Sequence, residues 1–380
     1  MKYCLPDYDN CLVNLSNSIL KNFGAETSAP TLKLADDLLD GGYKNVVLLL
    51  LDAMGCSIME KHLKPDGFFR SHLAGNISSV FPPTTVAATT SVISGLYPNE
   101  HGWLGWDTYF PNLVKNVAVF LNSEQMIEDP NDRSVRPRVI ANVPAADYHV
   151  AFRYCPYKSI MDRITEAGEK GYWSSPYVDP APKDLGAVLK RTEELCSEPG
   201  RKYIYAYWVE PDQTMHMQGT DGKVVHDLVN SIESQVEEFA SRLTDTLLLI
   251  TADHGHMNSI NHCILDYPEI MKCLVRLPSI EPRTLNFFVK DGYKEEFPKI
   301  FEDTFKDKFL LLTHDEVMEK KLFGLGKDHE MFNDMIGDYV AIATGNESIL
   351  NTHLEASKII GAHAGLTREE MEIPLIAAGL

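Results

Sequence analysis

Three unbroken, largely apolar runs dominate the hydrophobic pattern of the chain, at residues 45–51, 203–209 and 246–251. Runs of this length without alternation are typical of strands that are buried on both faces of a parallel sheet. Between the second and third runs, apolar residues recur at helical spacing from Val225 to Leu243, which predicts a crossover helix. The pattern therefore predicts an α/β fold with a mostly parallel central sheet.

Shorter patterns predict further elements around this sheet. Apolar spacing favours helices at residues 32–39, 158–167 and 183–196, and strands at residues 77–80 and 148–152. A further apolar run lies at residues 373–378.

The stretch from Asp266 to Gly345 is more charged and differs in character from the rest of the chain. It contains strand-like segments and one helical segment, at residues 285–289, 309–312, 339–343 and 295–305. We interpret residues 266–345 as an inserted α+β cap. Residues 1–265 and 346–380 then form the core of the fold.

Polar residues with metal-binding side chains follow all three buried runs. Asp52 follows the first, Asp212 and His216 follow the second, and Asp253 and His254 follow the third. The carboxyl ends of parallel strands meet at one edge of a sheet, where α/β proteins place their sites. The alternative for each residue by itself is a helix cap or a structural salt bridge.

A segment rich in small residues, 81–102, is expected to reach the same edge after the strand at 77–80. Two prolines, Pro82 and Pro83, stand near its beginning, and the small residues after them are predicted to run as a helix to Gly95, which places the hydroxyls of Thr84 and Thr85 near the helix start. That end of a helix favours an anion, although a threonine there can also serve only as a cap. His363 lies between small residues that allow close backbone approach, its alternative being a lone surface histidine.

Composition narrows the classes of partner and the compartment. The 380 residues carry a formal net charge of −19, which argues against a nucleic-acid polymer or an anionic membrane surface as the partner. No stretch approaches the roughly 18 apolar residues of a spanning helix, and the N-terminus lacks the apolar part of a signal peptide. Seven scattered cysteines without a CxxC pair favour reduced thiols. We expect a cytoplasmic protein.

The candidate ligands combine carboxylate oxygen with imidazole nitrogen and include no thiolate. This mixture suits two Zn²⁺ ions, with Mn²⁺ or another divalent metal as the alternative. Ca²⁺ and Mg²⁺ fit less well because they prefer ligand sets made only of oxygen.

Taken together, the motifs resemble the nucleotide pyrophosphatase/phosphodiesterase branch of the alkaline phosphatase superfamily. The most specific are Ser94–Pro98 with His101–Gly102, Glu210–Asp212 with His216, and Ala252–Gly255. The resemblance covers most of the chain and keeps the order of the family's motifs. It implies an alkaline-phosphatase-like three-layer sandwich and a metal-dependent phosphoric ester hydrolase.

Carried over position by position, the resemblance implies a catalytic site with two metal ions. One ion would be held by Asp212, His216 and His363. The second would be held by Asp52, Asp253 and His254, with the nucleophile as a further ligand. Counting back from Gly95 without gaps makes Thr85 that nucleophile, which would form a phosphothreonine intermediate.

The positions that should bind the rest of the substrate depart from the family pattern. Val86 stands where family members that bind nucleotides often have an aromatic residue, and Trp106 stands where they have an asparagine that contacts phosphate. Tyr207 matches the other aromatic position. These three residues are the expected substrate-binding set, and they put nucleotide specificity in question.

The sequence thus predicts a hydrolase of small phosphate diesters or pyrophosphates. A phosphomonoesterase or a phosphonate hydrolase on the same scaffold is the enzymatic alternative, because two such ions can support all three reactions. A sulfatase is disfavoured by threonine at the nucleophile position. The alternative from another class is a non-catalytic metal-binding protein that retains the fold.

Overall fold

The computed structural model describes residues 3–132, 134 and 137–380, and its core is a six-stranded sheet. The strand order is β2-β19-β10-β1-β9-β8, and only β19 runs against the others. The predicted mostly parallel sheet is therefore confirmed. Its strands are β1 (Asn45–Leu51), β2 (Leu73–Ser78), β8 (Lys170–Ser174), β9 (Lys202–Trp208), β10 (Thr246–Thr251) and β19 (Glu372–Gly379).

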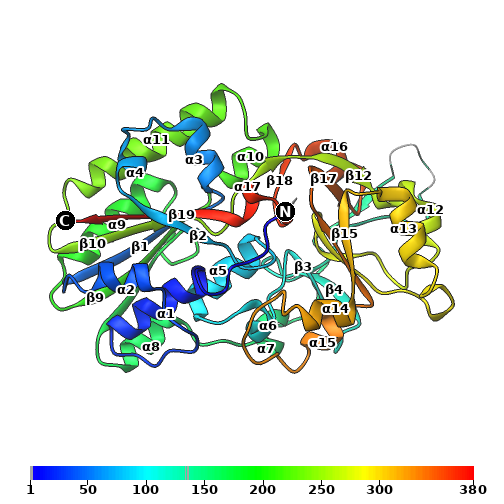
Figure 1. The fold of residues 1–380 in the computed structure, drawn as a ribbon, viewed down its shortest axis with the longest axis horizontal. Helices are drawn as coiled ribbons and strands as arrows, with labels where there is room; N and C mark the ends of the chain where they lie inside the picture. The colour runs from blue at the N-terminus through cyan, green and yellow to red at the C-terminus, as the bar shows by residue number, and fades with distance from the viewer. Residues whose placement is uncertain (1–2, 133, 135–136) are drawn as a thin grey trace.

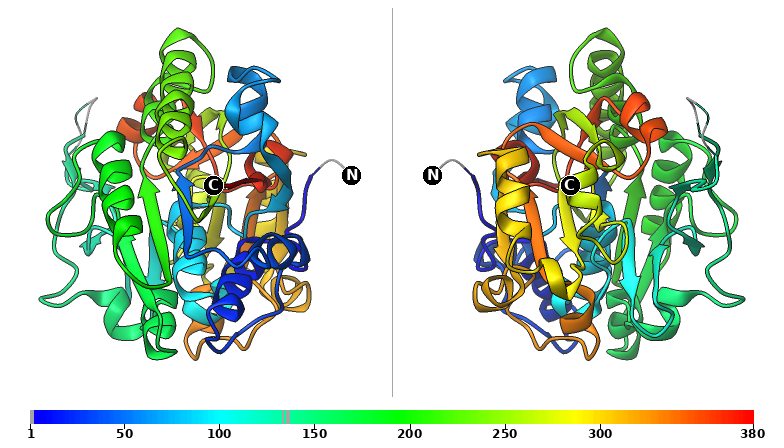
Figure 2. Two further views of the ribbon diagram at one scale, coloured as in Figure 1. Left: turned by 90° about the vertical axis from the view of Figure 1, so that its left-hand side faces the viewer. Right: turned by 90° about the vertical axis from the view of Figure 1, so that its right-hand side faces the viewer.

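Helices cover both faces of this sheet, which gives the expected three layers (Figure 2). One layer contains α1 (Leu12–Asn22), α2 (Lys33–Leu39), α5 (Thr85–Ser94) and α8 (Ile160–Glu166). The other contains α3 (Cys56–His62), α4 (Phe68–Ser71), α9 (Leu185–Ser197) and α11 (Lys223–Ala240). Every residue of β1 and β10 is buried between these layers, as their unbroken apolar sequences require.

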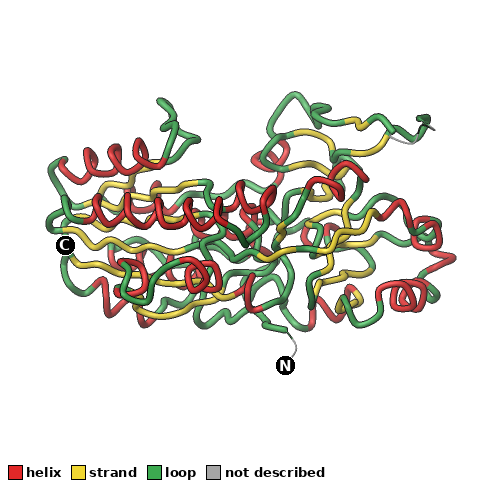
Figure 3. Tube along the Cα trace, turned by 90° about the horizontal axis from the view of Figure 1, so that it is seen from above, coloured by secondary structure: helices red, strands yellow, loops and turns green. Residues whose placement is uncertain are grey.

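A second sheet lies at the other end of the long axis (Figures 1 and 3). Its seven strands follow the order β15-β16-β14-β13-β3-β4-β5. The expected cap region supplies four of them: β13 (Ser279–Glu281), β14 (Thr284–Phe287), β15 (Phe309–Thr313) and β16 (Tyr339–Ala343). The other three come from an earlier part of the chain: β3 (Asp107–Phe110), β4 (Lys115–Ala118) and β5 (Ser123–Glu124). The boundaries 266 and 345 remain a prediction, and β3 to β5 lie outside them.

Short elements complete the fold around the two sheets. Beside the second sheet lie α12 (Pro268–Met271), α13 (Phe297–Phe305), α14 (His314–Glu319), α15 (Phe332–Met335), η1 (Ile264–Asp266) and η2 (Asp291–Tyr293). The others are α6 (Pro98–His101), α7 (Val150–Tyr154), α10 (Asp212–Gln218), α16 (His353–Lys358), α17 (Arg368–Met371), β6 (Ile127–Glu128), β7 (Val139–Ile140), β11 (Met257–Asn258), β12 (Ile260–Cys263), β17 (Glu347–Leu350) and β18 (Gly361–Ala362).

Two local predictions differ from the structure. The strand expected at residues 148–152 is wrong, because Val150–Tyr154 forms helix α7 and the His149 side chain caps it by accepting from the Phe152 N–H. The strand expected at residues 77–80 begins earlier and ends at Ser78.

A buried ion pair ties the second sheet to the central one. Arg283, in the turn between β13 and β14, donates from Nε to Glu370 Oε1 at 2.6 Å and from Nη2 to Glu370 Oε2 at 2.9 Å. Both side chains are fully buried, and Glu370 lies in α17, directly before β19. Glu370 Oε1 also accepts from the Gly365 N–H at 2.7 Å, so the pair also holds the segment that follows His363.

Two further findings concern the cysteine thiols and the apolar character of the helices. All seven cysteine thiols are free. Among the helices that the structure describes, none combines the length and the apolar character needed to cross a membrane.

We expect Arg283→Met to lower the free energy of unfolding by about 3–5 kcal/mol, because it leaves the Glu370 carboxylate buried without a positively charged partner. The matched control is Arg368→Met, whose exposed pair with Glu372 should contribute less than about 1 kcal/mol. Urea unfolding followed by circular dichroism measures both. Equal losses in the two variants would contradict a structural role for the buried pair.

Candidate active site

The candidate ligands meet at the carboxyl edge of the central sheet because their strands run in parallel. Asp52 follows β1, Asp212 begins α10 after β9, and Asp253 and His254 follow β10. His363 follows β18, which lies with α10 between the two halves of the molecule (Figure 1). The structure thus brings together side chains separated by as many as 311 residues, as the interpretation of the strand ends predicts.

The hydroxyl of Thr85 lies at the centre of this group. Its Oγ1 is 3.3 Å from Asp52 Oδ1, 3.4 Å from Asp52 Oδ2 and 3.2 Å from His254 Nε2. Thr85 is the first residue of α5 and is only partly buried, so its hydroxyl remains accessible. The residue predicted as nucleophile therefore contacts the predicted ligands.

Thr84 takes a different role from the one its position suggests. It occupies the N-cap of α5, yet its side chain makes no capping hydrogen bond. Its Oγ1 instead donates to Glu281 Oε1 at 2.5 Å, which links the helix start to strand β13 of the second sheet. The Thr84 hydroxyl therefore does not serve as a simple helix cap.

Three of the histidines present the same ring nitrogen to the site. Nδ1 of His216 lies 2.9 Å from Gly361 O, Nδ1 of His254 lies 2.9 Å from Gly255 O, and Nδ1 of His363 lies 3.2 Å from Pro83 O. A carbonyl oxygen can only accept, so Nδ1 carries a hydrogen and Nε2 is the ring nitrogen left to bind a metal. Metal-binding histidines are typically held in this way.

Candidate ligand atoms form three overlapping groups, each within 4.8 Å. Asp52, Asp253 and His254 form one group, which is the expected second ligand set. The expected first set is divided between the other two groups, one adding His254 to Asp212 and His363, the other adding His256 to Asp212 and His216.

His256 was not assigned a role from the sequence. Its Nδ1 lies 3.1 Å from Asp212 Oδ1, and its Nε2 is buried without a hydrogen-bond partner among the described residues. Burial lowers the pKa of His256 to about 4, so the ring is neutral. Its position two residues after His254 was the only signal in the sequence, and that signal does not distinguish a site residue from a core histidine.

Crowding of carboxyl groups makes the site suited to cations. Burial raises the pKa of Asp52 well above its usual range, and the charges of Asp253 and Asp212 raise it further. Burial also raises the pKa of Asp253, whose Oδ2 accepts no hydrogen bond from a described residue. A bound cation would neutralise these charges and occupy the unpartnered oxygen, so the donor set fits divalent metal ions.

Asp212 differs from these two carboxyl groups because a histidine compensates its charge. Burial opposes ionisation of Asp212, but His216 holds its pKa well below the usual range. In turn, Asp212 outweighs burial and raises the pKa of His216 to about 9. The two side chains form an ion pair with 3.4 Å between His216 Nε2 and Asp212 Oδ2. A divalent ion between them would replace that proton.

The backbone beside two candidate ligands is strained. Ala53, directly after Asp52, has φ of 60°, and Ala364, directly after His363, has φ of 87°. Non-glycine residues rarely adopt positive φ, and such strain often accompanies functional sites. The Ala53 N–H donates to Asp253 Oδ1 at 3.0 Å, so this conformation also joins the loops after β1 and β10.

Close backbone packing requires glycine in the loop that carries His254. A Cβ added to Gly255 would lie 1.9 Å from the carbonyl oxygen of Glu369, and one added to Gly55 would lie 2.5 Å from the Gly255 Cα. A larger residue at either position would push apart the loops that hold Asp52 and Asp253.

A pocket of about 580 Å³ opens over Thr85 and contains most of the predicted site. Trp106 and Tyr207 both line it, as expected of substrate-binding residues. Tyr207 is buried, however, and its hydroxyl donates to Asp52 Oδ2, which positions that carboxyl group. Val86 is fully buried in an apolar cluster with Phe81 and does not line the pocket. Its position thus does not support the expected contact with substrate.

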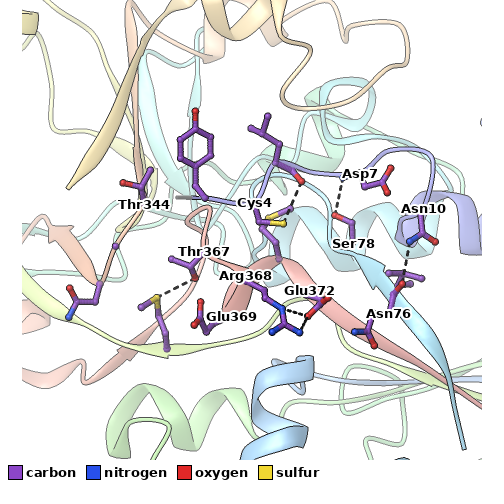
Figure 4. A pocket seen from close by; sticks show the side chains of 17 residues that line it. Cys4, Asp7, Asn10, Asn76, Ser78, Thr344, Thr367, Arg368, Glu369 and Glu372 are labelled. Atoms are coloured by element: carbon purple, nitrogen blue, oxygen red, sulfur yellow. Dashed lines mark hydrogen bonds and ion pairs between the residues drawn. The ribbon is translucent and has the colours of Figure 1, made fainter. Parts of the chain in front are cut away.

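A second pocket, of about 650 Å³, contains none of the predicted site residues. It lies beside the N-terminal segment and α17, where Arg368 pairs with Glu372 (Figure 4). This second pocket therefore offers none of the candidate ligands or the candidate nucleophile.

The candidate site is typical of metal-dependent phosphoric ester hydrolases. Comparison with known proteins agrees with this class. The chain belongs to the type I phosphodiesterase/nucleotide pyrophosphatase family, whose model matches residues 46–293. It is therefore a phosphoric ester hydrolase, as predicted. No curated protein matches the sequence.

Solved structures show the same fold at low sequence identity. Murine ectonucleotide pyrophosphatase/phosphodiesterase 5 is 17% identical with a TM-score of 0.65, and the match covers 88% of each chain. Phosphonoacetate hydrolase from Sinorhizobium meliloti 1021, in complex with phosphonoformate, is 14% identical with a TM-score of 0.62, and the match covers 87% of this chain and 89% of that one. The predicted alkaline-phosphatase-like fold is thereby confirmed.

We expect Zn²⁺ to raise the thermal midpoint of the chelator-treated protein, because it binds only where the folded chain gathers the ligands. At a free concentration of 100 times Kd, the gain is about 2.7 kcal/mol per site. His363→Ala should lose much of this shift, whereas His314→Ala, in α14, should retain it. Differential scanning fluorimetry measures the shifts, and equal shifts in both variants would exclude His363 as a ligand.

Proposed function

We propose that the protein hydrolyses small phosphate diesters or pyrophosphates, with Thr85 as the nucleophile. The observation that carries this proposal is the placement of the Thr85 hydroxyl within 3.4 Å of Asp52 and His254 on the wall of a pocket. No other hydroxyl near the site is equally suited among the described residues, because that of Thr84 is committed to Glu281.

Two divalent ions complete the proposed site. Zn²⁺ suits the mixture of carboxylate and imidazole best, and Mn²⁺ is the alternative. We assign Asp212, His216 and His363 to one ion, and Asp52, Asp253 and His254 together with Thr85 to the other. When bound, such ions neutralise negative charge at the reacting phosphate and lower the pKa of a coordinated hydroxyl or water.

The chain's own residues orient the first step. Thr85 Oγ1 attacks phosphorus in line, the bond to the leaving oxygen breaks, and a phosphothreonine forms. The first N–H groups of α5, from Thr85 and Val86, have no helical acceptor and no side-chain cap, so they can hold a non-bridging oxygen. Water then cleaves the phosphothreonine and restores Thr85.

Known relatives support the same assignment. One structure of murine ectonucleotide pyrophosphatase/phosphodiesterase 5 is that of an inactive threonine-to-alanine variant in complex with AMP. The bacterial neighbour was solved with phosphonoformate and with phosphonoacetate, which keeps a phosphonate hydrolase as the second candidate function. Comparing kcat/KM on matched monoesters, diesters and phosphonates separates the two. A cytoplasmic location remains a prediction.

We expect Thr85→Ala to abolish turnover of bis-p-nitrophenyl phosphate, because no nucleophile remains to form the covalent intermediate. Metal content, measured by inductively coupled plasma mass spectrometry, should stay near two ions per chain. Thr85→Ser, which keeps a hydroxyl, should retain part of the activity. A quenched reaction of the unaltered protein should yield the p-nitrophenyl ester of phosphothreonine at residue 85 by mass spectrometry, because only one p-nitrophenol leaves in the first step. Undiminished turnover by Thr85→Ala would rule out the nucleophile assignment.

A further inference from the structure

The carboxylate of Glu370 is fully buried and is held by five hydrogen bonds. Besides the two bonds from Arg283, its Oε1 accepts from the Gly365 N–H at 2.7 Å. Its Oε2 accepts from the Thr367 N–H at 3.1 Å and from the Thr367 hydroxyl at 2.7 Å. Burial opposes ionisation, but Arg283 and the other donors hold the pKa of Glu370 below its usual range. The group is therefore a carboxylate anchored through both oxygens.

This carboxylate contacts the loop that follows His363. Its Oε1 accepts from the N–H of Gly365, which lies two residues after His363. A Cβ added to Gly365 would lie 2.9 Å from Glu370 Oε2, so the loop passes directly against the carboxylate. Ala364, between the two residues, has a φ of 87°, and its carbonyl oxygen accepts from Thr284 Oγ1 at 2.5 Å. The strained backbone beside His363 is therefore fixed by two side-chain contacts.

The backbone of Glu370 holds the loop that carries His254. The Glu370 carbonyl oxygen accepts from the Gly255 N–H at 2.8 Å. The Gly255 carbonyl oxygen accepts in turn from His254 Nδ1 at 2.9 Å, which leaves His254 Nε2 facing Thr85. The place of the Glu370 carbonyl depends on the carboxylate, because the side chain bonds back to the N–H and the hydroxyl of Thr367 and so fixes the single turn of α17.

The two loops meet at the rings of His254 and His363. These rings are stacked, with centroids 3.9 Å apart and planes inclined by 20°. The two histidines are proposed ligands of different ions, so their relative position affects the geometry of both ion sites. One residue, Glu370, reaches both loops, the first through its carbonyl oxygen and the second through its carboxylate.

We propose that Glu370 is a positioning residue for both metal ions, which fixes the loops of His254 and His363 relative to each other. The inference rests on the ligands assigned under the proposed function and adds a residue that does not line the pocket over Thr85. Arg283 then anchors this residue to the second sheet. Outer contacts that orient metal ligands typically change metal affinity by about 10–100-fold when they are lost.

The test compares the same isosteric change at two neighbouring residues of α17. Glu370→Gln sets an amide NH2 against hydrogen-bond donors whichever oxygen it replaces, because Arg283 donates to both oxygens. Glu369→Gln is the matched control, since Glu369 is exposed and lines the second pocket (Figure 4). Zinc affinity is measured by competition with a chromophoric chelator, at a temperature where circular dichroism shows both variants folded. We expect Glu370→Gln to weaken both ions by about 10–100-fold and Glu369→Gln to weaken neither.

A spectroscopic measurement separates positioning from a general loss of stability. Co²⁺ bound in place of zinc absorbs visible light, and its spectrum reports the geometry of the ligands. We expect the cobalt spectrum of Glu370→Gln to change. Val236→Ala, which leaves a cavity under the fully buried face of α11, should lose stability and keep the unaltered spectrum. Thr367→Val removes one of the five hydrogen bonds and leaves the ion pair, so it should weaken both ions by a smaller factor.

Both measurements are made without turnover, which separates this inference from the proposed reaction. Weaker binding of both ions by Glu370→Gln, with an altered cobalt spectrum, supports the inference even if the unaltered protein hydrolyses no phosphoester. That second result would overturn only the proposed reaction. Unchanged affinities in Glu370→Gln and Thr367→Val, or weakening of one ion alone, would overturn the inference and leave the assignment of Thr85 intact.

Discussion

Repulsion among three crowded carboxyl groups, two of them buried, is the constraint on which the site depends. Asp52, Asp212 and Asp253 are brought together by β1, β9 and β10, and their separation is fixed by the sheet rather than by their own interactions. Such an arrangement destabilises the metal-free chain. It is maintained because the strands behind it bury a large apolar surface. The strained backbone at Ala53 and Ala364 is sustained by the same core.

Much of the carboxyl edge of the central sheet was predictable, because local sequence patterns determine it. Strands buried on both faces must be apolar throughout, so β1, β9 and β10 can be predicted from their apolar runs. The ends of these runs identify Asp52, Asp212 and Asp253. The start of α5 was also predictable, since Pro83 and the small residues after it indicate a helix that begins near Thr85. The role of each residue at the site still rests on the resemblance and on the proposal built from it.

Other features depend on pairings that no local pattern contains. Strand β3 joins the second sheet through β13, more than 160 residues later, and this pairing places Asp107 opposite Ile280. Helix α1 was not predicted because its buried face includes polar residues, among them Asn14 and Asn17, which bond to loops instead of following an apolar stripe. The expected contact of Val86 with substrate came from its position beside Thr85, whereas tertiary packing places Val86 in an apolar cluster.

The buried pair of Arg283 and Glu370 bears on how the enzyme exchanges ligands. Parting the two sheets would separate the two charges and would also break the Gly365 hydrogen bond to Glu370. The pair therefore favours one fixed arrangement of the two sheets. In that arrangement substrate enters a preformed cavity over Thr85, with Trp106, Phe120 and Tyr177 on its wall.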